Sequence, residues 1–205
     1  MMQTEQTFII GLDRTPEHVV LGAGESAKFT FIALPGRDSA LKFSADLTAP
    51  GASLDIAGLY VCESDEKVGI NINVRHLCGG CHSSQLFKGV ADGHSRVNFD
   101  GLIYVAPDAQ KTEAYQSSHN LLLSGDARVE SCPQLEIYAD DVICSHGATI
   151  GSLDEEGQFY MRSRGIPEAE ARRLQIVSFL SEVISRLPED AVSALREAAP
   201  QVFVD

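Results

Sequence analysis

The sequence lacks the long apolar segments that anchor proteins in membranes or direct them to export. No run of about 18 apolar residues occurs in the 205-residue chain, so no transmembrane helix is expected. The first residues, MMQTEQTFIIGLDR, contain neither a basic start nor an apolar stretch as long as a secretory signal requires. These two absences predict a cytoplasmic protein.

Basic residues are also scarce. Lys and Arg total 16 against 29 Asp and Glu, which gives a net charge of −13. A chain this acidic repels nucleic-acid phosphates and anionic lipid headgroups, so we expect neither nucleic acid nor a membrane surface among its partners. The GxxxxGK phosphate loop and the GxSxG nucleophile elbow are both missing. The chain is therefore not expected to bind ATP by that route.

The cysteine content argues against a disulfide framework, because the count is odd and the expected compartment is reducing. Free thiols in such a compartment are buried apolar groups, metal ligands or redox groups. The five cysteines are Cys62, Cys78, Cys81, Cys132 and Cys144.

The first 150 residues have the pattern of a succession of short strands. Weak internal similarity between SLDIAGLYV and RVNFDGLIYV indicates imperfect repeats. Such repeats fit a sandwich, a barrel or a β-helix, and periodicity alone does not choose among them. The β-rich runs cover 28–34, 41–47, 53–61, 69–76, 95–105 and 133–139. The turn pairs between them are Pro35-Gly36, Pro50-Gly51, Asp92-Gly93, Asp100-Gly101, Pro107-Asp108 and Gly125-Asp126.

From residue 151 the composition changes to that of a small helical domain. The SLDE sequence is a capping box, which predicts a first helix with Ser152 as its N-cap and Gly165 at its left-handed C′ position. Pro167 opens a second helix that runs to about Leu187, and a third helix is expected over about 189–199. We therefore divide the chain into a β-domain, residues 1–150, and a helical domain, residues 151–205.

The second expected helix is apolar over about half its circumference, whereas a surface helix carries an apolar stripe about 100° wide. Two interpretations are open. The helix lies wedged between the β-domain and the third helix, or part of its face docks a partner protein. The apolar positions are Leu174, Ile176, Val177, Phe179, Leu180, Val183, Ile184 and Leu187.

The motif CGGCH, from Cys78 to His82, contains metal-binding residue types. It matches the attachment pattern of c-type haem, but that chemistry needs export, and no export signal is present. A zinc site would need a second ligand pair, and a thioredoxin-like site would need a βαβ context. Two interpretations remain. The thiols of Cys78 and Cys81 lie in a loop without a function, or these residues bind a metal or cluster in a stand-alone metal or redox protein.

A second group of such residues lies in DDVICSHGAT, residues 140–149. If this segment is extended, Cys144 and His146 share one face, with their Cα atoms about 7 Å apart. A thiolate and an imidazole at that separation can reach one iron or zinc ion, and the pair suits iron–sulfur species. Two ligands do not complete a site, so others must come from another strand or another chain. A Cys and a His on one strand are also common as core or surface residues.

The stretch PQLEIYADDVICSHGATIGSLDEEGQFYMRSRGI, residues 133–166, closely resembles the C-terminal core of SufB/SufD proteins. Its ADDV, CSHGAT and GxLDEE…FYxxSRGI blocks resemble the SufD branch. Upstream, NVRHLCGGCHSSQLFKG and FDGLIYVAPDAQKTEAYQSSHN resemble further family segments. The resemblance covers about residues 55–187.

This resemblance implies a mainly β fold: a right-handed parallel β-helix followed by a small helical domain. It implies a scaffold subunit of the SUF system of iron–sulfur cluster assembly, with no enzymatic activity of its own. Such subunits pair through their β-helices, so the expected partner is a SufB-like scaffold or a second copy, forming a dimer. They dock the SUF ABC-type ATPase through the C-terminal helices, and that ATPase, not this chain, binds ATP.

The resemblance also assigns roles to individual residues. The His of the CSHGAT block, which contributes to the assembly site at the scaffold interface, corresponds to His146, and the Cys corresponds to Cys144. We expect them to hold an iron–sulfur cluster or iron transiently. Cys81 matches the Cys of a family pattern like PHCTS, whereas Cys78 and His82 depart from it. Typical members carry more β-helix and a helical domain upstream, so we expect a member shortened at the N-terminus, capped by residues 5–50 or by another subunit.

Overall fold

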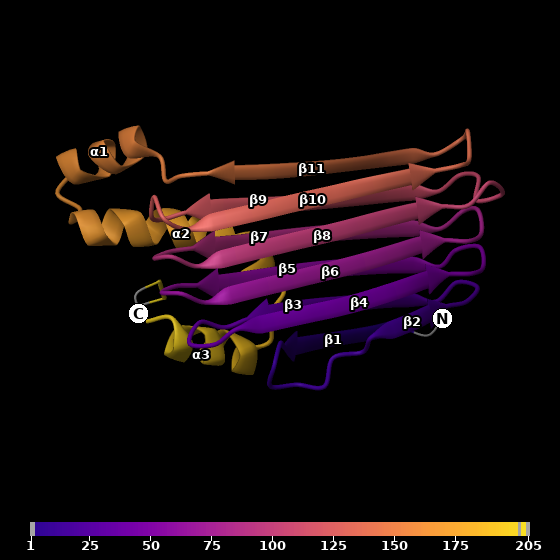
Figure 1. Ribbon diagram of the computed structural model, residues 1–205, viewed down its shortest axis with the longest axis horizontal. Helices are drawn as coiled ribbons and strands as arrows, with labels where there is room; N and C mark the ends of the chain where they lie inside the picture. The colour runs from indigo at the N-terminus through magenta and orange to yellow at the C-terminus, as the bar shows by residue number, and fades with distance from the viewer. Residues whose placement is uncertain (1–2, 201, 204–205) are drawn as a thin grey trace.

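The computed structural model describes residues 3–200 and 202–203. Within these residues eleven strands precede three helices (Figure 1). In the described part of the chain no helix begins before residue 155, as the sequence predicts, and none of these helices is long and apolar enough to span a bilayer. The strands are β1 (Gln3–Ile9), β2 (His18–Leu21), β3 (Ser26–Ala33), β4 (Ser39–Leu47), β5 (Ser53–Cys62), β6 (Lys67–His76), β7 (His82–Ala91), β8 (Arg96–Val105), β9 (Glu113–Leu122), β10 (Arg128–Ile137) and β11 (Ile143–Gly151).

The strands form two parallel sheets that the chain visits in alternation. The odd sheet has the order β1-β3-β5-β7-β9-β11, and the even sheet has the order β10-β8-β6-β4-β2. Each turn of the resulting solenoid contributes one strand to each sheet. Residues stacked in successive turns are about 30 positions apart: Asn71 and Asp100 are separated by 29, and Gln85 and Gln116 by 31. This is the parallel β-helix that the resemblance implies. Residues 5–50, expected as a cap, instead form further turns through β1 to β4.

Alternation along the strands fills the solenoid, because every second side chain points inward. The turns nearest the N-terminus are filled with aromatic rings: Phe29 lies 5.4 Å and Phe31 5.3 Å from Phe43, measured between ring centroids, and Phe8 stacks on Phe31. The rings of Phe29, Phe31 and Phe43 are all buried. The dispersion and apolar burial of this stack make it the hydrophobic centre of the β-domain.

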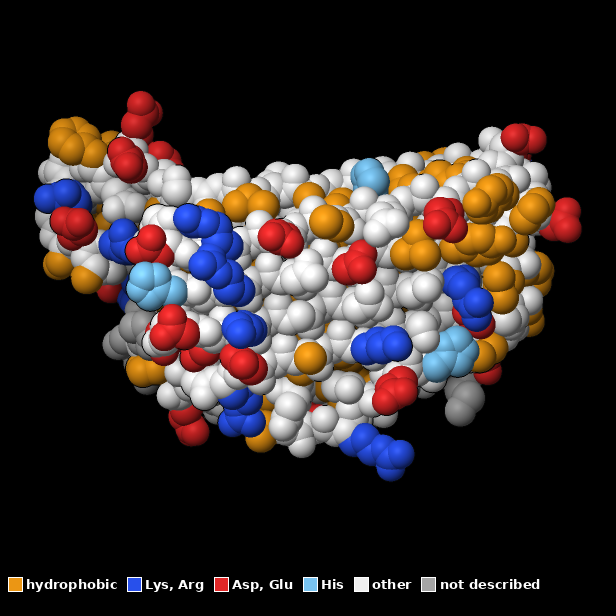
Figure 2. Space-filling model, viewed as in Figure 1, with side chains coloured by type: hydrophobic (Ala, Val, Ile, Leu, Met, Phe, Trp, Pro, Cys, Tyr) orange, Lys and Arg blue, Asp and Glu red, His pale blue; other side chains and the backbone are white. Residues whose placement is uncertain are grey.

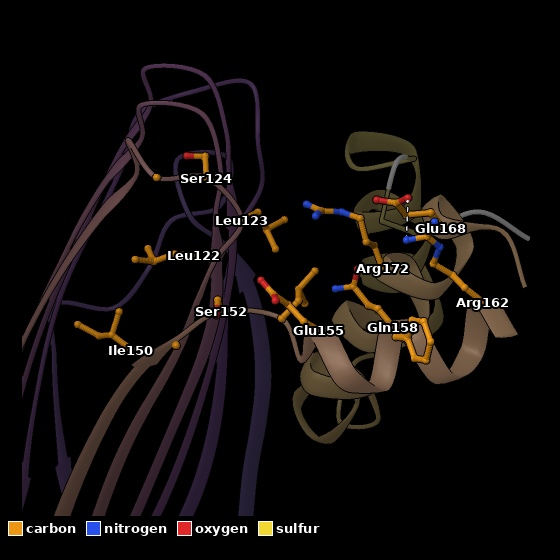
Figure 3. Close-up of a pocket in the computed structure, with 14 residues that line it drawn as sticks. Leu122, Leu123, Ser124, Ile150, Ser152, Glu155, Gln158, Arg162, Glu168 and Arg172 are labelled. Carbon is orange, nitrogen blue, oxygen red and sulfur yellow. Dashed lines mark ion pairs between the residues drawn. The ribbon is translucent and has the colours of Figure 1, made fainter.

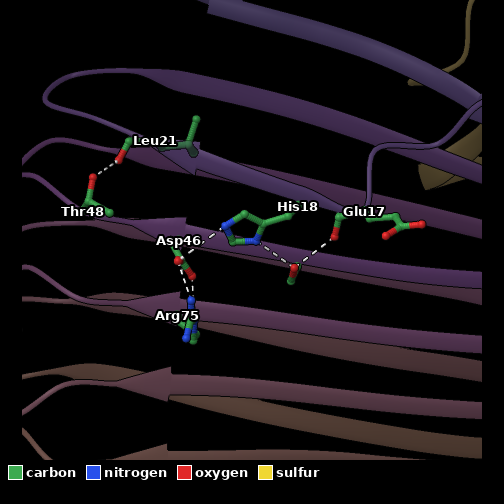
Figure 4. A network of polar contacts seen from close by, with 7 residues as sticks. Glu17, His18, Leu21, Asp46, Thr48 and Arg75 are labelled. Atoms are coloured by element: carbon green, nitrogen blue, oxygen red, sulfur yellow. Dashed lines mark hydrogen bonds and ion pairs between the residues drawn. The ribbon is translucent and has the colours of Figure 1, made fainter.

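The short strand β2 is held to the even sheet by side chains on its outer face (Figure 4). His18 Nδ1 lies 2.8 Å from Ser44 Oγ, and its Nε2 lies 3.6 Å from Asp46 Oδ2. Asp46 is buried and accepts two hydrogen bonds from the Arg75 guanidinium, of 2.6 and 2.5 Å. The bidentate pair joins β4 to β6, and His18 adds β2, so Asp46 connects three successive strands of the even sheet.

One expected turn is wrong. Asp100 and Gly101 lie in the middle of β8, not between strands. Gly101 points inward, and a methyl group there would lie 2.5 Å from Gln116 Nε2 of the facing sheet. The glycine is therefore needed for close packing across the interior, not for a change of chain direction. Of the other pairs, Gly36, Gly51 and Gly93 have positive φ, as turns require.

The helices are α1 (Glu155–Ser163), α2 (Glu168–Ile184) and α3 (Glu189–Ala198). The N-cap of α1 is Asp154, whose Oδ1 accepts from the N–H of Glu156, so the prediction of Ser152 is wrong. Residue 152 belongs to the extended connection that follows β11. Gly165 has φ +90° and its N–H bonds to Arg162 O, which confirms the left-handed end of α1.

The first interpretation is confirmed in part, because the second helix lies against the β-domain. α2 packs on the outer face of β5 and β7, and its inner side shares one apolar cluster with α3 (Figure 1). The buried members on α2 are Ala171, Ile176, Leu180 and Val183. Leu174 is 40% exposed, and the helix ends at Ile184, before the expected Leu187. Contact with the sheet thus uses only part of the apolar circumference.

Candidate functional site

The last turn of the solenoid is open. β11 pairs only with β9, and β10 pairs only with β8, so within the described residues each sheet presents one unpaired edge at this end. An unpaired edge exposes a row of backbone N–H and C=O groups that another strand can bind. Both predicted ligands, Cys144 and His146, lie on β11.

Cys144 points toward the solenoid interior. It is aligned with Ala114 of β9 and packs beside Ala109 and Ala139. Burial raises the pKa of its thiol, and a backbone hydrogen bond at Ala114 partly opposes this rise. The thiol is therefore protonated at neutral pH, and a metal that binds it must displace the proton.

His146 shares this inward face, because it follows Cys144 by two residues. It is aligned with Gln116 of β9. The His146 side chain is nevertheless exposed, since no further turn covers it within the described residues. The prediction that the two side chains share one face is thus confirmed, and the face is the interior side of an open turn.

The groups below His146 are polar and were not predicted. Gln116 and Gln85 are buried, and Gln116 Nε2 donates to Gln85 Oε1 at 2.8 Å. Gln116 Oε1 and Gln85 Nε2 have no hydrogen-bond partner among the described residues, although both atoms are buried. On the same strand Ser118 bonds to Ser131 Oγ at 3.1 Å. Beneath the open turn the interior is therefore polar on the β9 side, whereas the β8 side stays apolar, with Phe99, Ile103 and Val105 buried.

Apolar side chains are exposed around the same end. Figure 2 shows hydrophobic side chains gathered where β10 ends and β11 begins, at the right of the view. Tyr138 is 59% exposed and Ile143 60% exposed, and Ile137, which ends β10, is also exposed. Exposed apolar groups grouped beside unpaired strand edges are typical of a protein–protein interface.

The CGGCH residues do not converge. Cys81 is buried, with Sγ 3.2 Å from Ala49 O, and burial, with a further contribution from Cys78, raises the pKa of its thiol. His82 lies on the outer side, with Nδ1 3.7 Å from Glu113 Oε2. No group of three metal-binding side chains occurs in the described part of the chain.

Cys81 is also remote from the other predicted ligands. It precedes β7, which is two strands away from β11 in the odd sheet, a separation of about 10 Å at the usual strand spacing. The structure thus brings Cys144 and His146 together but leaves Cys81 apart from them. All five cysteines are free thiols.

A cavity of about 790 Å³ lies between the ends of β9 and β11 and the helices α1 and α2 (Figure 3). Leu123 and Ile150 line its strand side, and Arg172 points from α2 toward Leu123. Phe159, on the α1 wall, is 73% exposed. An exposed ring beside a wide cavity offers a second surface for a partner, distinct from the open turn.

Comparison with known proteins agrees with this architecture. Residues 12–179 match the family described as SUF system FeS cluster assembly, SufBD core domain. The chain is 40% identical over 149 residues to the iron–sulfur cluster assembly protein SufD of Escherichia coli, covering 73% of this chain and 35% of that protein. It is 30% identical to SufD of Bacillus subtilis, covering 77% of this chain and 39% of that protein. A SufBD family protein of Mycobacterium leprae is 30% identical, covering 88% of this chain and 47% of that protein. The chain thus spans less than half the length of these relatives. It belongs to the SufB/SufD family of iron–sulfur cluster assembly proteins and is SufD-like.

Proposed function

We propose that this chain is a scaffold subunit of the SUF system that catalyses no bond change itself and pairs through the open turn of its solenoid. The observation that carries this proposal is the coincidence of three features at one end. The unpaired edges of β10 and β11, the exposed apolar side chains and the pair Cys144 and His146 all lie there.

The mode of pairing follows from the edges. A partner strand that binds β11 and another that binds β10 would extend both sheets and cover the polar interior. A SufB-like scaffold or a second copy has the matching architecture, because each ends in the same type of parallel turn. The apolar groups Ile137, Tyr138 and Ile143 would then be buried at the rim of the joint.

The cargo is an iron–sulfur cluster or iron, held transiently. Cys144 supplies a soft thiolate after losing its proton, and His146 supplies an imidazole nitrogen. Two ligands leave coordination positions open, and the partner supplies the rest across the joint. Release remains possible because neither subunit alone completes the site.

The helices dock the ABC-type ATPase. α1 and α2 border the 790 Å³ cavity, and Phe159 and Tyr160 of α1 are exposed, at 73% and 59%. Aromatic side chains of this kind are common anchors of protein interfaces. ATP binding and hydrolysis then belong to the partner, and the chain transmits the resulting movement to its open turn.

A His146→Ala variant tests the site. Co-expressed with a SufB-like scaffold and the SUF ATPase, it should retain its fold and complex formation but lose most of the bound iron and acid-labile sulfide. His94→Ala is the control, since His94 is an exposed histidine in the turn before β8. Unchanged iron and sulfide in the His146 variant would refute the assignment.

The alternative of a stand-alone metal or redox protein predicts metal in the isolated chain, lost on Cys78→Ser substitution. The geometry gives it less support, because Cys81 points inward and His82 lies outward. We therefore do not adopt it.

A further inference from the structure

A column of three cationic side chains crosses the even sheet at the end nearest the helices. Lys67, Arg96 and Arg128 are the first residues of β6, β8 and β10, and they are aligned in register. All three are exposed on the outer face. Figure 2 shows Lys and Arg side chains stacked there, at the left of the view. We call these three residues the basic column.

Among the described residues the side chains of the basic column form no ion pair, although the Asp38 carboxylate accepts from the backbone N–H of Lys67 at 2.8 Å. In the same part of the chain, no carboxylate lies within ion-pair distance of the side-chain nitrogens of Lys67, Arg96 or Arg128, although the chain has 29 acidic residues against 16 basic ones. Elsewhere in the chain, Arg75, Lys88 and other cationic side chains form ion pairs with carboxylates. Like charges on directly neighbouring strands repel each other, so this arrangement is unfavourable without a ligand.

The two guanidinium groups are held in place by the backbone. Arg96 Nη1 donates to Asp126 O at 3.2 Å, and Arg128 Nη1 donates to Gly125 O and Ala127 O at 2.6 and 2.8 Å. Each guanidinium has five N–H groups in a fixed plane. The turn at 125–127 therefore fixes both side chains while leaving most of their donors available to an oxyanion.

A shallow hollow of about 300 Å³ lies between these side chains. Gly69 forms part of its floor, and a methyl group at Gly69 would touch nothing within 4 Å. Asn98 adds an amide, and Glu130 contributes the one carboxylate of the lining. The hollow thus admits an acidic side chain beside the cations.

We propose that the basic column binds the carboxylates of an acidic segment of a partner protein. The first and third cations are about 10 Å apart at the usual strand spacing, which is more than one carboxylate or phosphate spans. Carboxylates two positions apart in an extended segment are separated by about 7 Å, so one acidic segment can engage the whole column. This site lies on the outer face of the even sheet and reaches the open turn only at Arg128 on β10, and it does not depend on cluster binding.

A labelled oligoglutamate peptide, followed by fluorescence anisotropy with the full chain, tests the proposal. We expect salt-sensitive binding, because the contacts are exposed ion pairs. Arg96→Glu should weaken binding by about tenfold or more. Lys42→Glu is the matched control: Lys42 is an exposed cation on β4 of the same sheet, outside the column. Equal weakening by both variants would show only general surface charge and would overturn the proposal.

A Gly69→Val variant tests the contribution of the hollow without changing the charge of the basic column. The strand position accepts a β-branched residue, since Gly69 has no positive φ and a methyl group there has room. Thermal unfolding should be unchanged, whereas peptide binding should weaken because the hollow is filled. Binding of inorganic phosphate with no binding of the peptide would overturn the proposal in favour of a small-anion site, and so would absence of any binding.

Discussion

If the subunits pair through the open turn, one charge added to its inward face should greatly weaken their association. Ala148 lies on β11, on the same inward face as His146, and it is exposed in the single subunit. Ala148→Asp should therefore leave the stability of the subunit within about 0.5 kcal/mol. On pairing, the new carboxylate would be covered without a cationic partner, which costs several kcal/mol. A cost of about 3 kcal/mol weakens the dissociation constant by roughly a hundredfold.

Ser145→Asp is the matched control. Ser145 lies on the same strand and is also exposed, but it points to the outer face, so its charge stays in water when the sheets are extended. Sedimentation equilibrium of the chain alone measures self-association, and a pull-down with a SufB-like scaffold measures the heteromeric complex. If Ala148→Asp pairs as tightly as the natural chain in both assays, the open turn is not the joint.

Two further predictions concern the solenoid itself. Gly89→Ala should destabilise the chain by about 3 kcal/mol in urea unfolding, because the added methyl group would overlap the buried ring of Tyr60; an unchanged midpoint would contradict this packing. Burial lowers the pKa of His76 to about 4, and nearby His82 adds to the effect. In the unfolded chain this residue is protonated near pH 6.5, so between pH 6.5 and 4 the unfolded state binds more protons than the folded state. The free energy of unfolding should therefore fall by about 3 kcal/mol as the pH drops through this window. His76→Leu should remove most of that fall in urea titrations at pH 7 and pH 4.5.

The predicted β-rich runs contain or overlap β3, β4, β5, β6, β8 and β10, but they miss β1, β2, β7 and β9, and the choice of a β-helix could not be predicted from them. Half-buried strands of a solenoid, a sandwich and a barrel share the same two-residue period. What distinguishes the solenoid is alignment of residues 29 to 31 positions apart, as in Gln85 and Gln116, and the sequence repeat at that spacing is weak. The resemblance to SufB/SufD proteins, not the periodicity, indicated the β-helix.

Two local predictions were wrong, the Ser152 N-cap and the Asp100-Gly101 turn, because both features depend on tertiary structure. Ser152 and Asp154 both have side chains that cap helices well, and the choice depends on where the chain leaves β11. Asp100-Gly101 has turn composition, but Gly101 is required by the Gln116 side chain from the facing sheet. Neither cause lies within the few residues that a local pattern includes.

The shared face of Cys144 and His146 could be predicted, whereas the polar interior below them could not. In AYQSSHN of β9 nearly every residue is polar, so the sequence does not show which side chains point inward. The fold places Gln116, Ser118 and Asn120 inside. Only the register with β7 and β11 shows that Gln116 lies between Gln85 and His146.

This polar interior bears on why the open turn is suited to pairing. A buried amide atom without a partner costs about 1–3 kcal/mol, and Gln116 Oε1 and Gln85 Nε2 are two such atoms. Leucine at these positions would avoid that cost, as the phenylalanines of the first turns do. Gln116, Ser118 and Asn120 lie directly beneath the open turn, where a second subunit can supply hydrogen-bonding groups, although buried polar side chains such as Ser39 and His76 also occur in other turns. Sites that break the rules of core packing are commonly functional. The interior itself therefore favours the open turn, not the aromatic end, as the place where a partner and its cargo bind.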